Sequence, residues 1–193
     1  MDRAGIETML MNYYRRIDRD VLQFDFLANK PKPGDYDEEI RSMGGHIYVS
    51  PGLNPIRYPG YIKYMRQILA ADRDIAIVHA HNEAMGYYAL RGAERAGIKT
   101  RIAHAHNTRI IRDYKWPLKM VCKLLLPHAA SDLWACGRDA GIYFFGRRRW
   151  NAGGMVMRNA IDTARFRFDP EVRAAVRAEN GLGDRTVIGH VGR

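Results

Sequence analysis

The chain contains few cysteines and no long apolar run. Cys122 and Cys136 are the only two in 193 residues, too few for a disulfide framework and without the spacing of metal ligands. A reducing cytoplasm is the simplest interpretation, and we expect both thiols to be small buried groups. No apolar stretch approaches the ~18 residues of a membrane span, and the start Met1-Asp2-Arg3 lacks the features of a signal peptide. The composition therefore argues against secreted disulfide scaffolds and integral membrane proteins.

Acidic residues are in deficit. The formal charge is +10, the isoelectric point is near 9.8, and 47% hydrophobic content is enough for a real core. This charge favours an anionic partner: a nucleic acid, a phosphorylated substrate or an anionic membrane surface. No nucleic acid is expected, because the basic residues are dispersed and no DNA- or RNA-binding motif occurs.

One tetrapeptide, His-Ala-His-Asn, occurs twice, at His79–Asn82 and His104–Asn107. Each copy closes a short apolar run, Ile75–Val78 or Ile102–Ala103, and a helical segment at 83–96 separates the copies. This order predicts a βαβ unit whose right-handed crossover puts both polar ends on the same edge of a parallel sheet. Open α/β sheets bind their ligands at that edge.

The same alternation of strands and helices continues along the chain. Further helices are predicted from Gly5 to Ile17, Tyr36–Met43, Tyr61–Ala71, Trp116–Leu125, Arg138–Phe145 and from Pro170 to Gly181. Further strands are predicted at Val21–Leu27, His46–Val49, Leu133–Cys136, Met155–Met157 and Thr186–Val191, with Arg147–Trp150 in a loop. The pattern predicts the α/β class, with a Rossmann-like, doubly wound parallel sheet.

Both ends of the chain look cut. A glycine followed at once by a helix usually stands behind a strand, yet Gly5 lies at the start, and the last predicted strand leads into Gly192 and Arg193 with no helix after it. We expect a fragment, with residues 1–169 forming a domain that lacks its first strand and residues 170–193 beginning a second domain.

Five motifs, together with their order, resemble those of the group 1, or family 4, glycosyltransferases of the GT-B type. They are Gly5–Thr8, the two His-Ala-His-Asn strands, Arg158–Asp162 and Ile188–Arg193. The resemblance implies two Rossmann-like domains facing across a cleft. It also implies retaining transfer of a hexose from a nucleotide-diphosphate sugar to a cell-surface polysaccharide or glycolipid, with no metal or other cofactor. This chain is then the acceptor-side domain and is inactive alone.

The resemblance assigns three residues to the donor. Gly5 matches the second glycine of the family's amino-terminal loop, which lies against the donor phosphates, and Ala4 stands where the first glycine is usual. Gly192 and Arg193 match the segment whose arginine neutralises the donor diphosphate. A guanidinium and backbone N–H groups suit that developing negative charge.

Four further residues are assigned to the reacting sugars. His106 matches the histidine that faces the reacting sugar, and it is the predicted catalytic residue. His81, Asn107 and Asn159 are the predicted substrate-binding residues, and Asn159 opens a turn that resembles the family's Asn-Gly-Val-Asp. The roles of His79 and His104 stay open between core and function.

Two alternatives remain. A His-x-His pair at a strand end also suggests a metal-dependent hydrolase, although Asn82 and Asn107 are poor zinc ligands and no metal site is expected. Alternatively, the lysine face at positions 115, 119 and 123, with Arg147–Arg149, suggests a membrane-surface binding module. The expected location is the cytoplasm, with peripheral contact at the inner face of the cell membrane.

Overall fold

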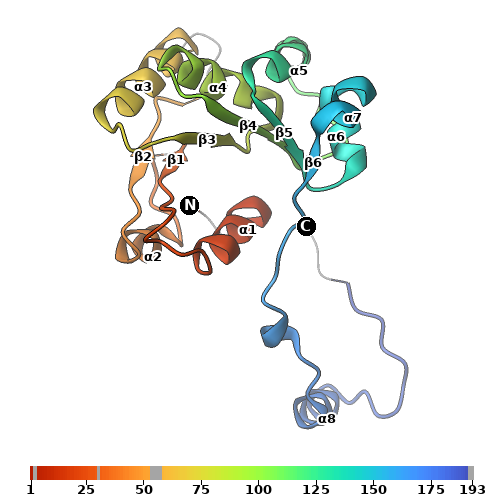
Figure 1. Ribbon diagram of the computed structural model, residues 1–193. Helices are drawn as coiled ribbons and strands as arrows, with labels where there is room; N and C mark the ends of the chain where they lie inside the picture. Colours follow the sequence, from red (N-terminus) through yellow and green to blue (C-terminus); the bar gives the residue numbers. More distant parts are fainter. Residues whose placement is uncertain (2–3, 30, 53–57, 191–193) are drawn as a thin grey trace. The chain divides into compact units, whose positions relative to one another are not determined.

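The computed structural model describes residues 1, 4–29, 31–52 and 58–190. The chain forms two compact units, Met1–Ala160 and Ile161–Arg193, and each is described by itself (Figure 1). The domain boundary predicted between residues 169 and 170 stays a prediction.

Every strand pair in the described part of the first unit is parallel. The strands are β1 (Phe26–Ala28), β2 (Ile47–Val49), β3 (Ile77–Ala80), β4 (Thr100–Ala105), β5 (Asp132–Ala135) and β6 (Met155–Val156). They form a two-stranded sheet, β1-β2, and a four-stranded sheet, β3-β4-β5-β6. The α/β class with parallel strands is confirmed, although the strands divide into two sheets where one was predicted.

Helix α1 (Gly5–Tyr14) precedes the first strand, and helices connect the consecutive strands, as parallel pairing requires. The connecting helices are α2 (Asp37–Ser42), α3 (Tyr58–Ala71), the 3₁₀ helix η2 (Glu83–Met85), α4 (Gly86–Arg95), α5 (Trp116–Ala129), α6 (Arg138–Phe145) and α7 (Arg147–Gly153). Helices α3, α4 and α5 lie on one side of the four-stranded sheet and α1 lies on the other (Figure 1). No helix in the described part of the chain is both long and apolar enough to cross a bilayer.

Small residues line the sheet face that the helices cover. Ala80, Ala103, Ala105 and Ala135 are buried in the main core, together with larger side chains from α4, α5 and α6. Alternate strand residues share a face, so the alanines of each His-Ala-His-Asn segment point to these helices while its histidines point away. Short alanine side chains let the helices approach closely: a Cβ built on Gly86 would lie 3.1 Å from the Cβ of Ala80.

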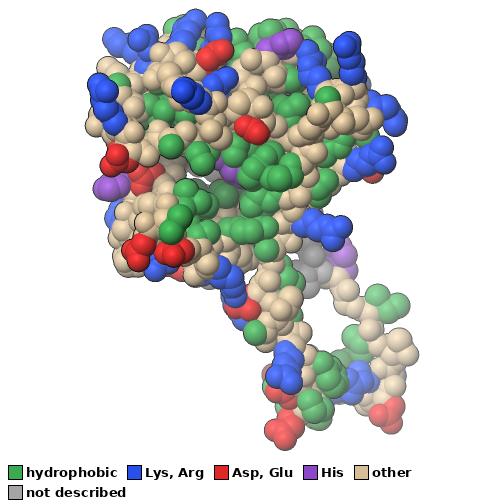
Figure 2. Space-filling view, viewed as in Figure 1, with side chains coloured by type: hydrophobic (Ala, Val, Ile, Leu, Met, Phe, Trp, Pro, Cys, Tyr) green, Lys and Arg blue, Asp and Glu red, His purple; other side chains and the backbone are tan. Residues whose placement is uncertain are grey.

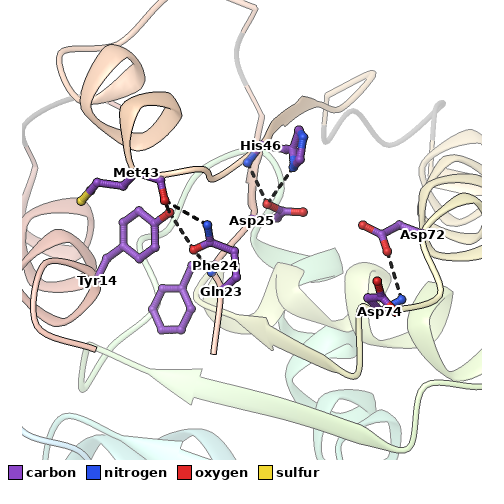
Figure 3. A network of polar contacts seen from close by, with 8 residues as sticks. All are labelled: Tyr14, Gln23, Phe24, Asp25, Met43, His46, Asp72 and Asp74. Atoms are coloured by element: carbon purple, nitrogen blue, oxygen red, sulfur yellow. Dashed lines mark hydrogen bonds and ion pairs between the residues drawn. The ribbon is translucent and has the colours of Figure 1, made fainter. Parts of the chain in front are cut away.

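A second, smaller core forms around α1, α2 and β1. The ring of Tyr14 stacks on Phe24 at 5.5 Å and meets Phe26 edge-on. Its hydroxyl lies 2.8 Å from Oε1 of Gln23 and 3.2 Å from the carbonyl oxygen of Met43 (Figure 3). Because the hydroxyl keeps hydrogen-bond partners, this large aromatic side chain is fully buried without an unpaired polar group.

The second unit contains η3 (Thr163–Phe166) and α8 (Pro170–Glu179). Asp169 caps α8, its carboxylate accepting hydrogen bonds from the backbone N–H groups of Glu171 and Val172. The predicted strand at 186–191 is wrong for residues 186–190, which form no strand, and Ile188 is 94% exposed. A strand needs a hydrogen-bonded neighbour, and this segment has none among the described residues; Val191 lies outside them.

Two further predictions are corrected in the first unit. Arg147–Trp150, predicted as a loop, begins helix α7. Gly146, with φ of 81°, ends α6, and α7 begins directly after it. In the sequence, a glycine at the end of a helix suggests that a loop follows. The strand predicted at 21–27 is wrong for residues 21–25, because β1 begins only at Phe26, and Val21 and Leu22 are exposed.

Helix α4 packs against α3 at a glycine. A Cβ on Gly92 would lie 2.6 Å from the Cβ of Met65, whereas a Cβ on Gly60 in α3 would meet nothing within 4 Å. We expect Gly92→Ala to destabilise the fold by about 1–3 kcal/mol through overpacking, and Gly60→Ala to stabilise it by up to about 1 kcal/mol through helix propensity. Urea unfolding of both variants measures the difference. Equal free energies of unfolding would show that the helices separate without cost.

Candidate functional site

The two His-Ala-His-Asn segments lie side by side at the carboxyl edge of the four-stranded sheet. In the β3–β4 ladder Ala80 pairs with Ala103, so the second segment is offset by two residues relative to the first. An even offset preserves the alternation of faces, and the four histidines therefore lie on one face. We call His79, His81, His104 and His106 the histidine cluster.

The cluster contains two hydrogen-bonded pairs. Nε2 of His79 lies 3.1 Å from Nδ1 of His104, and Nδ1 of His81 lies 2.9 Å from Nε2 of His106. Each bond runs diagonally between the strands. The structure thus brings together the predicted catalytic residue, His106, and the predicted substrate-binding residue, His81.

Contacts between the rings hold the two pairs against each other. The ring centroids of His79 and His81 are 4.1 Å apart, and those of His104 and His106 are 4.2 Å apart. Trp134 of β5 meets His79 edge-on at 5.0 Å. The imidazole planes are therefore fixed by packing as well as by hydrogen bonds.

Burial keeps the histidine cluster neutral. Burial lowers the pKa of His106 to about 4. Burial, followed by repulsion from neighbouring rings, lowers the pKa of His79 to about 4 and that of His104 to about 3. The same causes lower the pKa of His81. The imidazoles are thus lone-pair acceptors and N–H donors at neutral pH, not cations.

The four rings differ in access. His104 is 1% exposed, and its Nε2 is buried without a hydrogen-bond partner. His79, His81 and His106 are only partly buried. His104 is therefore the buried member of the cluster.

Glu83 belongs to the same edge, and the sequence analysis missed it. Its carboxylate accepts a hydrogen bond from the Nδ2 amide of Asn107, linking the end of the second tetrapeptide to the residue after the first. Burial raises its pKa. Its φ of 49° makes it the one non-glycine residue with positive φ in the described part of the chain, and such strain gathers at functional sites. Its position directly after a polar strand end was the available signal.

Cysteine contacts complete the edge. The Sγ of Cys136 donates to the backbone carbonyl of His106 at 3.3 Å, which supports the strand end that carries this histidine. Cys122 is buried as predicted, while Cys136 is half-buried.

The remaining predicted residues lie elsewhere in the first unit. Gly5 is exposed and begins α1, and a Cβ there would meet nothing within 4 Å. Ala4 is extended (φ −115°, ψ 173°), so its methyl group causes no strain where the family has glycine. Asn159 is exposed. Asn12 donates to the carbonyl oxygen of Ala160 and the hydroxyl of Tyr13 donates to that of Arg158, so α1 holds the residues on either side of Asn159. Gly192 and Arg193 lie outside the described residues.

Three cluster members have the chemistry of metal ligands. One nitrogen from each of His79, His81 and His104 lies within 4.8 Å of the other two. No carboxylate or thiolate of the described residues belongs to this group. The expectation that no metal is bound stays a prediction.

Sequence comparison decides the family. A model of Glycosyltransferase Family 4 matches residues 3–136. The chain belongs to glycosyltransferase family 4. Among its relatives, the putative glycosyltransferase EpsF of Bacillus subtilis (strain 168) is 33% identical over 198 residues, which cover 100% of this chain and 52% of EpsF.

A second relative has a more detailed name. The GDP-mannose-dependent alpha-(1-6)-phosphatidylinositol monomannoside mannosyltransferase of Mycolicibacterium smegmatis is 28% identical over 199 residues, covering 96% of this chain and 48% of that enzyme. The family 4 chain therefore spans about half the length of these curated relatives.

Solved structures show the same fold. Anabaena Alr3699/HepE in complex with UDP matches with a TM-score of 0.65 at 15% identity, over 89% of this chain and 53% of that one. The complex of HepE with UDP and glucose matches with a TM-score of 0.55 over 84% and 51%. The predicted GT-B-type α/β fold is confirmed.

The neutral cluster predicts an acid-sensitive fold. Between about pH 6.5 and 5 the unfolded chain gains a proton on each histidine, whereas the folded cluster, with pKa values of about 3 to 4 for His79, His104 and His106, does not. Stability is therefore present above about pH 6.5 and falls as pH decreases, by about 1.4 kcal/mol per pH unit for each such histidine. Urea unfolding at several pH values measures this slope.

A single variant isolates the contribution of one cluster member. His104→Leu should reduce the pH slope relative to that of the native chain, because the variant lacks a buried histidine whose pKa is lowered in the fold. Equal slopes in the variant and the native chain would show that His104 is protonated in the folded state.

Proposed function

We propose that the full-length protein transfers a hexose from a nucleotide-diphosphate sugar to a cell-surface polysaccharide or glycolipid acceptor, with retention. The observation that carries this proposal is the His81–His106 pair at the carboxyl edge of a parallel sheet in a family 4 chain. The names of GDP-mannose and UDP in the relative and the structural neighbour support a nucleotide-linked donor. The proposal requires no metal or other cofactor.

The sheet edge suits the recognition of a sugar. Neutral imidazoles exchange hydrogen bonds with hydroxyl groups without attracting free phosphate as cations do. His106 is proposed to contact the reacting sugar, with His81 and Asn107 beside it. Asn107 is exposed and has Glu83 as its present partner, so a sugar hydroxyl competes with that carboxylate for the amide.

The donor phosphates are proposed to lie at α1. This helix of ten residues begins at Gly5 with open space beside it, and the first N–H groups of a helix favour negative charge. Gly192, Arg193 and Asn159 are proposed to complete the donor and substrate contacts. Residues 1–169 are then the acceptor-side domain and 170–193 the beginning of the donor-binding domain.

Substitution of His106 tests the reaction. In the full-length protein, His106→Ala should lower transfer from a nucleotide-sugar by about 10²-fold, the typical effect of removing a hydrogen-bonding group at the reacting centre. Detection of the released nucleotide diphosphate measures the rate. His46→Ala, at an exposed histidine, is the matched control and should retain full activity.

The same assay separates transfer from metal-dependent hydrolysis. Because the proposed reaction uses no metal, a chelator should leave the rate unaltered, whereas loss of activity on chelation favours the hydrolase. Full activity of His106→Ala would remove this residue from the site.

A membrane surface is the proposed partner of helix α5. The exposed apolar residues Val121, Leu124 and Leu125 lie on this helix and are 52%, 69% and 40% exposed. Arg149 of α7 donates to Nε2 of His128 at 2.7 Å, which brings the exposed Arg147–Arg149 run to the end of α5. An apolar patch bordered by cations suits an anionic leaflet.

The predicted lysine face contributes less than the arginines. Lys119 pairs with Asp113 at 2.7 Å, and the ammonium of Lys123 lies 3.8 Å from the ring centroid of Tyr143. Both lysines therefore fold back on the protein. Figure 2 shows basic side chains spread over the helical layer, so the apolar patch, more than overall charge, singles out α5. The proposed location is accordingly the inner face of the cell membrane, on the cytoplasmic side.

Vesicle flotation tests this partner. The chain should float with vesicles containing phosphatidylglycerol and not with vesicles of phosphatidylcholine alone. The double variant Arg147→Ser/Arg148→Ser should bind about 30-fold more weakly, since each of the two cations near the surface contributes about 1 kcal/mol. Lys63→Ser/Arg66→Ser removes the same charge from exposed positions on α3 and serves as the control. Equal loss in both double variants would indicate a general charge effect and not docking through α5.

A further inference from the structure

The His81–His106 hydrogen bond has a consequence for both rings. Nδ1 of His81 and Nε2 of His106 are 2.9 Å apart, and a hydrogen bond between two nitrogens holds one proton. We propose that His81 is a positioning residue that determines which protonation form of His106 meets the substrate, and that the pair offers one N–H donor and one bare nitrogen to the hydroxyl groups of a sugar. The identity of that ligand rests on the proposed glycosyl transfer, whereas the coupling of the two rings does not.

Two neutral imidazoles that share one proton have only two arrangements. If Nδ1–H of His81 donates, then Nε2 of His106 accepts, the proton of His106 is on Nδ1, and Nε2 of His81 is bare. If Nε2–H of His106 donates, Nδ1 of His106 is bare and Nε2 of His81 carries the proton. In either arrangement the two outer nitrogens are one donor and one acceptor. Exchange moves one proton across the shared bond and one through a hydroxyl or water, with no change in total charge.

The outer nitrogens are free to meet a ligand. Neither Nε2 of His81 nor Nδ1 of His106 has a hydrogen-bond partner within the described ranges. Neither is among the fully buried unpaired side-chain atoms, which are the Tyr58 hydroxyl and Nε2 of His104. Nε2 of His81 and Nδ1 of His106 therefore keep some access to solvent, whereas Nε2 of His104 is buried.

The second pair serves as a rigid backing. His79 packs against His81 with a tilt of 36° between the rings, His104 stacks on His106, and His79 and His104 are hydrogen-bonded to each other. Rotation of either outer ring by half a turn would break the shared bond and disturb the stack. The neighbouring rings thus fix which nitrogen His81 and His106 each direct toward a ligand.

A pair of rings that offers one donor and one acceptor matches the chemistry of a sugar. Each hydroxyl both donates and accepts, and neighbouring hydroxyls on a hexose offer the same combination twice. A lysine only donates hydrogen bonds and a carboxylate only accepts them, so each can use only one of the two roles of a hydroxyl. The coupled pair can meet a hydroxyl in either role, because its two arrangements exchange the donor and acceptor roles of the outer nitrogens.

Nitrogen NMR of the ring atoms tests the coupling in this chain. With ¹⁵N-labelled histidine, the ¹⁵N shifts of His81 and His106 should be those of neutral rings at pH 7. Substitution of either residue should change the shifts of the other. His81→Leu should change the ¹⁵N shifts of His106, because its Nε2 loses its partner. His81→Asn should leave the ¹⁵N shifts of His106 at their native values, since the side-chain amide of asparagine reaches the position of Nδ1 and keeps the hydrogen bond to Nε2 of His106. Unaltered His106 shifts in His81→Leu would overturn the coupling.

Two controls keep this result decisive. His79→Leu removes the stacked neighbour of His81 but not the shared bond, and it should leave the protonation form of His106 in place. If His81→Leu does not fold, the reciprocal change His106→Leu, read at His81 and compared with His106→Gln, gives the same information. A stoichiometric transition metal ion in the chain purified without a histidine tag would also overturn the inference, because the ion would take the shared lone pairs.

Kinetics of the full-length protein test the sugar contact. His81→Leu should lower kcat/KM for the sugar substrates about tenfold, the effect of losing one neutral hydrogen bond, and His81→Asn should restore most of it. Absence of transfer by the native protein would refute the proposed function while the NMR result stands. Native kcat/KM in His81→Leu, in a chain whose NMR shows uncoupled rings, would refute the sugar contact alone.

Discussion

The parallel register of β3 and β4 is the constraint on which the site depends. Since Ala80 pairs with Ala103, extending the ladder by one residue places His81 beside His104. The two tetrapeptides are therefore displaced by two residues, which leaves all four histidines on one face and makes the bonds from His79 to His104 and from His81 to His106 diagonal. Displacement by one residue would send both histidines of one segment to the helix-covered face, where the alanines now lie.

Burial of this face explains why the cluster is made of imidazoles. Lysines or carboxylates in the same place would be charged at neutral pH, and unpaired buried charges are costly. Imidazoles become neutral when they are buried and still form hydrogen bonds with one another, as the lowered pKa values and the two short contacts show. A polar edge is thus retained in a half-buried place, at the expense of stability in acid.

Local sequence patterns predicted the elements better than their pairing. Helix α6 begins and ends at the predicted residues, and both His-Ala-His-Asn segments lie at strand ends. The diagonal pairing was not predictable, because no residue of either strand specifies the register between them. Helix α7 was missed because a glycine breaker looks alike between two helices and between a helix and a loop. The strand predicted at 186–190 had the right composition but no hydrogen-bonded neighbour among the described residues.

Glu83 shows how the pairing governs a site residue that periodicity misses. Its backbone is in the left-handed region, which disfavours side chains with a Cβ, and its carboxylate binds Asn107 from the neighbouring strand. That bond forms only when β3 and β4 end at the same edge, so the register that joins the histidines also holds this strained turn. A ligand that takes the amide of Asn107 would release Glu83 from its partner. Binding at this edge is therefore coupled to the backbone between β3 and η2, the same segment that carries His81.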